Sequence, residues 1–133
     1  SFLEDDEIID YLNKNEKGQP VILEAQGDSY TDYERISSFT GLPTVAGWWV
    51  HEWLWRGSSD VVGKRIPEVV SLYESNSIDE TKLLIKKYQI KYVIISRLER
   101  QKYPNLDEKK WSKIGRLIFK SSNGFGALYR LNQ

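Results

Sequence analysis

Cysteine and methionine are absent from this 133-residue sequence, and histidine occurs only once, at His51. Without cysteine, disulfide bridges, thiolate zinc sites and cysteine nucleophiles are excluded. Long apolar runs are also lacking, because none approaches the ~20 residues that a transmembrane helix needs. No secretory apolar segment opens the chain either. What remains is a chain that must fold by burying its own apolar side chains.

An excess of charge of either sign is lacking as well. Lys and Arg together number 19, as do Asp and Glu, so the formal net charge is zero. A neutral chain is a poor general ligand for nucleic acid, and we expect no nucleic-acid partner. The hydrophobic content of 40% and the charged content of 29% are typical of a globular domain. We expect residues 1–133 to form a single domain with its own core.

Apolar spacing and turn residues predict alternating helices and strands. The first turn of the first predicted helix is acidic, which suits the helix dipole. Ser77 and Glu80 form a capping-box pattern, and Asn123-Gly124 between two apolar runs predicts a hairpin. The expected helices cover residues 3–15, 32–37, 62–73, 78–88 and 105–114, and the expected strands cover residues 21–25, 43–47, 92–96, 117–119 and 127–131.

This order of elements predicts a layered α/β fold. We expect a short mixed, mostly parallel sheet that is flanked by helices and ends in a C-terminal antiparallel hairpin.

A tryptophan-rich stretch, residues 41–57, is the first candidate for a functional site. It contains four of the five tryptophans, the only histidine, and two charged residues close to it; these are Trp48, Trp49, Trp53, Trp55, His51, Glu52 and Arg56. In one interpretation, Glu52 and Arg56 form a local ion pair and the indoles pack as core. In the other, the indole faces and the polar side chains bind a ligand such as a sugar ring.

Two further segments are expected at the carboxyl ends of buried strands, where open α/β sheets bind ligands. Glu24 is an acid within an apolar strand, and the polar segment that follows it includes Asp28, Ser29 and Tyr30. Arg97 directly follows the strand predicted over residues 92–96. The alternative for both segments is an ordinary solvated connection with salt-bridged side chains.

Several classes of chemistry are excluded by the inventory of motifs. The sequence has no phosphate-binding loop, no dinucleotide fingerprint and no serine nucleophile elbow. A metal site around the single histidine would need carboxylates such as Glu24, Asp28, Asp32 or Glu52 to complete it. We therefore expect no metal and no other cofactor in this domain.

Several blocks of the sequence resemble the C-terminal extramembrane domain of the "YYY" family, large polytopic membrane proteins of bacteria and archaea whose function is unassigned. The resemblance covers residues 8–131. The blocks are Glu24-Ala-Gln-Gly-Asp-Ser-Tyr30, Thr40-Gly-Leu-Pro-Thr-Val-Ala-Gly-Trp48, His51-Glu-x-x-Trp-Arg-Gly57, Leu84-Ile-x-Lys-Tyr-x-Ile-x-Tyr-Val93 and Leu98-Glu-Arg100.

That family is similar in layout to the glycosyltransferases that use lipid-linked sugars, including the oligosaccharyltransferases. The resemblance implies a soluble domain on the extracytoplasmic side of the cell membrane, cut from a larger multi-pass protein. It also implies that the parent's membrane part carries the catalytic acid and a divalent metal. One departure matters: oligosaccharyltransferases carry a Trp-Trp-Asp-Tyr-type motif after the first strand of this domain, where Glu24-Ala-Gln-Gly-Asp-Ser-Tyr30 stands here. Their peptide recognition is therefore not carried over.

Two hypotheses follow from the residues and the resemblance together. In the first, the domain helps a glycosyltransferase-like parent to bind a lipid-linked sugar, a lipid-phosphate head group or an acceptor, and is inactive alone. In the second, it is a non-catalytic domain that docks on the parent's transmembrane part. The candidate ligand-binding residues are Glu24, Asp28, Ser29, Tyr30, Trp48, His51, Glu52, Trp53, Trp55, Arg56 and Arg97.

Overall fold

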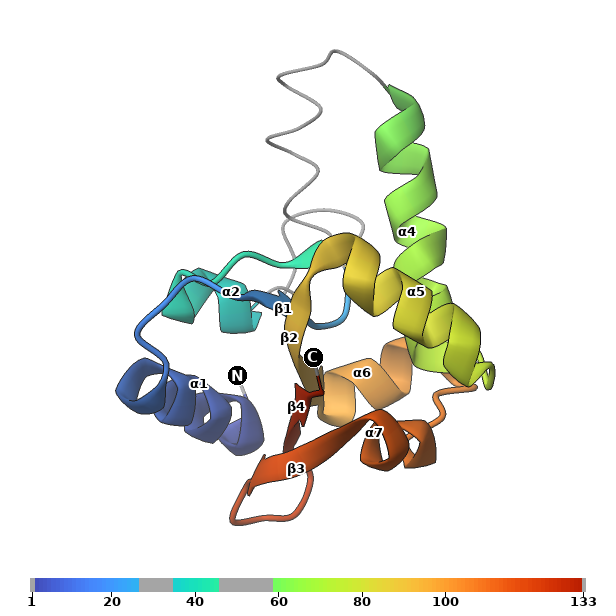
Figure 1. Ribbon diagram of the computed structural model, residues 1–133. Helices are drawn as coiled ribbons and strands as arrows, with labels where there is room; N and C mark the ends of the chain where they lie inside the picture. The colour runs from blue at the N-terminus through green and yellow to red at the C-terminus, as the bar shows by residue number, and fades with distance from the viewer. Residues whose placement is uncertain (1, 27–34, 46–58, 133) are drawn as a thin grey trace.

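The computed structural model describes residues 2–26, 35–45 and 59–132, which fold around a four-stranded sheet (Figure 1). The strands are β1 (Val21–Leu23), β2 (Ile90–Ile95), β3 (Gly115–Lys120) and β4 (Ala127–Leu131), and they lie in the order β1-β2-β4-β3. β1 runs parallel to β2, whereas β4 pairs antiparallel with both β2 and β3. The mixed α/β fold and its C-terminal hairpin are therefore confirmed.

Parallel pairing contributes less to the sheet than predicted, because only one of the three strand pairs is parallel. Of the strand expected over residues 43–47, the described residues 43–45 form one parallel bridge, between Ile22 and Thr44, and residues 46–47 lie outside the described part of the chain. The Pro43 carbonyl accepts a hydrogen bond from the Ile22 N–H at 2.8 Å, and the strand pairing does not continue beyond Thr44. Val45 is already helical.

Helices cover both faces of the sheet and make three layers (Figure 1). On one side lie α1 (Leu3–Asn15) and α2 (Arg35–Thr40). On the other lie α4 (Ser59–Glu74), α5 (Ile78–Tyr88), α6 (Arg97–Lys102) and α7 (Lys109–Ile114). Among the described residues, no helix is both long enough and apolar enough to cross a membrane.

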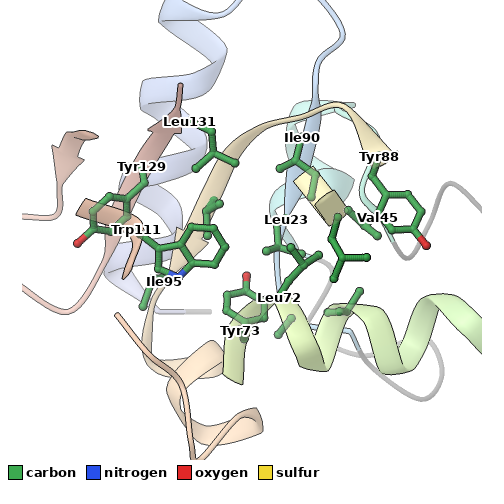
Figure 2. Close-up of a cluster of buried hydrophobic side chains, with 14 of the residues drawn as sticks. Leu23, Val45, Leu72, Tyr73, Tyr88, Ile90, Ile95, Trp111, Tyr129 and Leu131 are labelled. Atoms are coloured by element: carbon green, nitrogen blue, oxygen red, sulfur yellow. The ribbon is translucent and has the colours of Figure 1, made fainter. Parts of the chain in front are cut away.

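The alternation of side chains along the strands divides the core in two. On β2, Val93 and Ile95 face the layer of α4, α5 and α7, whereas Tyr92 and Ile94 face α1 and α2. The first of these cores is the larger, and Figure 2 shows Tyr73 and Trp111 among its buried side chains. β2 is therefore buried on both faces, as its apolar sequence predicts.

Capping residues set the limits of the helices. The Ser77 side chain accepts a hydrogen bond from the Glu80 N–H at 3.2 Å and begins α5, as predicted. Gln89, the residue after α5, caps the C-terminal end of this helix with a left-handed backbone whose φ is 56°. α5 therefore leads directly into β2, which starts at Ile90.

Candidate functional site

The structure describes two of the predicted site residues, Glu24 and Arg97, and both lie where the parallel strands β1 and β2 end. The remaining candidates lie outside the described residues: Asp28, Ser29, Tyr30, Trp48, His51, Glu52, Trp53, Trp55 and Arg56. The geometry of the site is therefore built from this edge of the sheet and from the residues that border the segment 27–34.

Arg35, the first residue of α2, lies at the centre of a buried polar cluster. Its Nη1 is 3.1 Å from Glu24 Oε1 and 2.7 Å from Glu99 Oε2. Its Nη2 donates to Asp5 Oδ1 at 2.9 Å, to Glu99 Oε1 at 2.9 Å and to Ser96 Oγ at 2.7 Å. Arg35 is only 6% exposed and Glu99 is fully buried. The cluster joins α1, the ends of β1 and β2, α2 and α6.

Glu24 uses both of its carboxylate oxygens within the protein. Besides Arg35, Oε1 accepts from the Ile36 N–H at 3.1 Å, and Oε2 accepts from the Ser37 N–H at 2.9 Å. These two N–H groups belong to the first turn of α2, where helical donors have no partner within the helix. Glu24 therefore caps α2 from outside, and its role as a ligand contact stays a prediction.

The cluster contains three carboxylates and one guanidinium, and burial together with the neighbouring charges shifts the pKa values of Glu24 and Glu99. Burial, reinforced by the neighbouring Glu99 carboxylate, raises the pKa of Glu24 to about 8 against the opposing effect of Arg35. Glu99 is also buried, but the charge and hydrogen bonds of Arg35 outweigh burial and lower its pKa. Glu24 is therefore the member of the pair that holds a proton near neutral pH.

Glu99 is a member of the cluster that the sequence reasoning missed. Two alternatives were expected for the segment after β2, a ligand-binding segment or a solvated connection, and the structure shows the helix α6 there. Glu99 accepts from the Ser96 N–H at 2.9 Å and from the Ser96 hydroxyl at 2.8 Å, which closes the first turn of α6. Ser96-x-x-Glu99 is a capping-box pattern, so this signal was present in the sequence.

Arg97 contacts α1 instead of the Arg35 cluster. Its Nε is 2.6 Å from Glu4 Oε2 and its Nη2 is 2.9 Å from Glu4 Oε1, which is a bidentate ion pair. The guanidinium lies 4.1 Å from the ring centre of Phe2 and 4.7 Å from that of Phe125. The hydrogen bonds from Arg97 and Asn123 hold the pKa of Glu4 at about 2. Although the Arg97 side chain is 39% exposed, its charge is thus already paired.

The cluster also fixes the chain on both sides of the segment 27–34. Before the segment, the Ala25 N–H donates to Glu99 Oε2 at 2.8 Å, and the Gln26 N–H donates to the Tyr103 hydroxyl at 3.0 Å. After it, Arg35 is held as described above. The candidates Asp28, Ser29 and Tyr30 therefore belong to a segment whose two ends are anchored to one rigid edge of the sheet.

The described cluster holds neighbouring segments of the chain in position. Carboxylates that converge in this way attract a cation, and here the Arg35 guanidinium supplies the positive charge. A carboxyl group that titrates near neutral pH has the pKa of an acid–base catalyst. However, Glu24 is only 3% exposed, and protein donors occupy its oxygens. The observed role of the cluster is therefore to hold the residues that border the segment 27–34.

Comparisons with known proteins identify a match to a solved structure. No family model matches the chain, and no curated protein does so either. One matching structure is the C-terminal globular domain of an oligosaccharyltransferase from Archaeoglobus fulgidus, with 12% sequence identity and a TM-score of 0.63. The match covers 99% of this chain and 99% of that one. The chain therefore has the fold of an oligosaccharyltransferase globular domain over its whole length.

Proposed function

We propose that this chain is the extracytoplasmic domain of a multi-pass membrane protein of the glycosyltransferase type, a relative of the "YYY" proteins. In this role it helps the parent to bind a lipid-linked sugar, a lipid-phosphate head group or an acceptor. The observation that carries the proposal is the match over the full length of both chains to a globular domain of an oligosaccharyltransferase. The parent's transmembrane part supplies the catalytic acid and any divalent metal, so the isolated chain is inactive.

Binding is assigned to the edge of the sheet that contains the Arg35 cluster. The support is that this edge anchors both ends of the segment 27–34, so polar side chains there are presented from fixed points. On this proposal Asp28, Ser29 and Tyr30 orient hydroxyl groups. The tryptophan-rich stretch provides the stacking faces, and Arg56 holds the phosphate.

The alternative is a non-catalytic domain that docks on the transmembrane part. The observation in its favour is that the polar atoms of the two described candidates, Glu24 and Arg97, already contact protein partners. On this view the tryptophans are docking residues near the membrane interface, where tryptophan is favoured.

A titration with a short-chain, water-soluble polyprenyl-phosphate sugar separates the two proposals. We expect the NMR signals of the amides bordering the segment, those of Ala25, Gln26, Ile36 and Ser37, to shift on addition of the probe. The His51→Ala and Arg56→Ala variants should reduce these shifts without unfolding the chain. Arg116→Ala, which changes an exposed arginine of β3, is the matched control.

The outcomes assign the function as follows. Unchanged amides at this edge, together with loss of assembly in full-length Trp53→Ala or Trp55→Ala, would support docking and overturn the binding role. Turnover of the polyprenyl-phosphate sugar by the isolated chain would contradict the claim that catalysis resides in the membrane part.

A further inference from the structure

A second site lies at the opposite end of the sheet from the Arg35 cluster. It is a pocket of about 490 Å³ where the end of α5, the start of β2, the end of α7 and the residue after β4 meet. Its volume falls within the range of small-molecule sites. The residues that line it are Lys82, Ile85, Lys86, Gln89, Ile90, Lys113, Ile114 and Asn132.

The floor of the pocket is apolar. Ile90 and Ile114 are almost completely buried members of the larger core, and Ile85 packs against that core while half-exposed. Because these side chains come from β2, α7 and α5, the floor is a continuous part of the folded domain. An apolar chain placed on it would be removed from water without any rearrangement of the core.

The rim of the pocket is cationic. Three exposed lysines, Lys82 and Lys86 on α5 and Lys113 on α7, line it, and none of the described lining residues is acidic. None of the three forms a salt bridge within the described part of the chain. By contrast, Lys87 and Lys91, which flank the same region of the sequence, are paired with Glu68 and Glu16. A neutral protein thus gathers three unpaired positive charges around one apolar pocket.

Helix stabilisation explains part of this arrangement. Lys86 and Lys113 lie in the last turns of their helices, where positive charge suits the dipole. Lys82 lies one turn earlier on α5, and this explanation does not cover it. The helix-end carbonyls near the pocket already accept hydrogen bonds, those of Ile85 and Lys86 from the Gln89 N–H and that of Ile114 from Asn132. The side chain of Gln89 also donates to the Lys86 carbonyl, at 2.8 Å.

With those carbonyls satisfied, the polar groups that the rim offers to a ligand are mainly ammonium donors. We propose that this pocket binds a monomeric anionic amphiphile, with its apolar chain on Ile85 and the aliphatic stems of the lysines and its carboxylate or phosphate among the three ammonium groups. The charge of the rim and the apolar floor each select one half of such a molecule. The site goes beyond the proposed function and does not depend on it, because it uses the other end of the sheet.

Dodecyl phosphate, used below its micelle concentration, is the probe for this pocket. We expect it to shift the NMR signals of the amides of Ile85, Ile90, Ile114 and Asn132. The Lys82→Gln/Lys86→Gln double variant should weaken binding at least about tenfold, and Lys113→Gln should weaken it as well. Lys109→Gln is the matched control, since Lys109 is an exposed lysine of the same helix that does not line the pocket. The control should bind within about twofold of the wild type.

Three further probes test the chemical class of the ligand. Dodecyl maltoside, a neutral amphiphile, and inorganic phosphate should each bind much more weakly than dodecyl phosphate. If either binds as tightly, or if Lys109→Gln weakens binding as much as Lys113→Gln, the proposal is overturned. Binding only to vesicles that contain phosphatidylglycerol would show that the domain contacts a membrane surface and does not bind a ligand in the pocket, and it would overturn the proposal. Absence of shifts at the four amides would also overturn it, whatever happens at the edge near Ala25.

Discussion

At the scale of single residues, one arginine organises the described part of the candidate site. Arg35 is paired with carboxylates that are 11, 30 and 64 positions away in the sequence. The sequence indicated that Glu24 was unusual, since it is an acid in an apolar strand. It did not indicate the partner, because pairings across such separations depend on the tertiary fold. Replacing members of this cluster therefore tests whether these buried pairings stabilise the fold.

Glu24→Gln should change how stability depends on pH. The folded-state pKa of Glu24 is about 8, above the ordinary 4.5, so the folded protein keeps a proton that the unfolded chain releases. Stability from this group is complete below pH 4.5 and is lost as pH rises through 8, with a slope of at most about 1.4 kcal/mol per pH unit. Glu4 and Glu16, whose pKa values are about 2, act only below this window.

Urea unfolding of the wild type and Glu24→Gln between pH 5 and 7.5 measures this effect. The free energy of unfolding of the wild type, relative to the variant, should fall as pH rises. A difference that is constant across the window would contradict the description of Glu24 as a buried, protonated carboxyl group.

Arg35→Met should be among the most damaging substitutions in the chain. It leaves Glu99 and its neighbours buried without their counter-charge, which typically costs about 3–5 kcal/mol. Part of this loss should be recovered as pH falls from 7 to 5, because protonation removes the unpaired charges. Thermal unfolding followed by circular dichroism at several pH values checks both statements. Arg116→Met, on the exposed edge of β3, is the control and should leave the melting temperature nearly unchanged.

At the scale of elements, local sequence signals correctly predicted the elements whose limits depend on local interactions. The Ser77 cap, the helix over residues 3–15 and the hairpin around Asn123-Gly124 are all observed. Of the strand predicted over residues 43–47, the described residues form only the bridge at Thr44, because the backbone is already helical at Val45. The acidic first turn of α1 was assigned to the helix dipole, yet Glu4, Asp5 and Glu7 reach Arg97, Arg35 and Ser122. Tertiary partners of this kind leave no local signal.

Ser77→Ala should lower the free energy of unfolding by about 1 kcal/mol, because it removes the acceptor of the Glu80 N–H at the start of α5. Ser77→Asp keeps an acceptor at this position and should restore most of the loss. Chemical denaturation of the three proteins provides the comparison. Equal destabilisation by Ala and Asp would show that the cap does not hold α5.

Gly126→Ala should loosen the packing of the β3–β4 connection on α1. A Cβ atom at Gly126 would lie 2.8 Å from Glu4 Cβ and 3.2 Å from Ile8 Cδ1. Overpacking of this kind typically costs about 1–3 kcal/mol. Gly124→Ala meets no neighbouring atom but is strained by its φ of +80°, at about 1 kcal/mol. Urea unfolding that ranks Gly124→Ala as the more harmful variant would contradict this close contact.

At the scale of the whole molecule, the central sheet of the three-layer fold has two ends with different properties. One end holds the Arg35 cluster and the residues that border the segment 27–34, and the other holds the lysine-rimmed pocket. The alternation of predicted helices and strands indicated a layered fold. The position of Glu24 and Arg97 at the ends of predicted strands indicated that both lie at one edge of the sheet. The pocket was not predicted, because its residues come from α5, β2, α7 and the end of β4, and only the fold brings them together.

The central claim is that this domain takes part in sugar transfer by its membrane-bound parent. The most direct measurement is the rate of transfer from a polyprenyl-phosphate-linked sugar by the full-length protein in membranes, at equal amounts of folded protein. His51→Ala and Arg56→Ala should each lower this rate at least about tenfold relative to Arg116→Ala. Rates within about twofold of that control, for both variants, would contradict the claim.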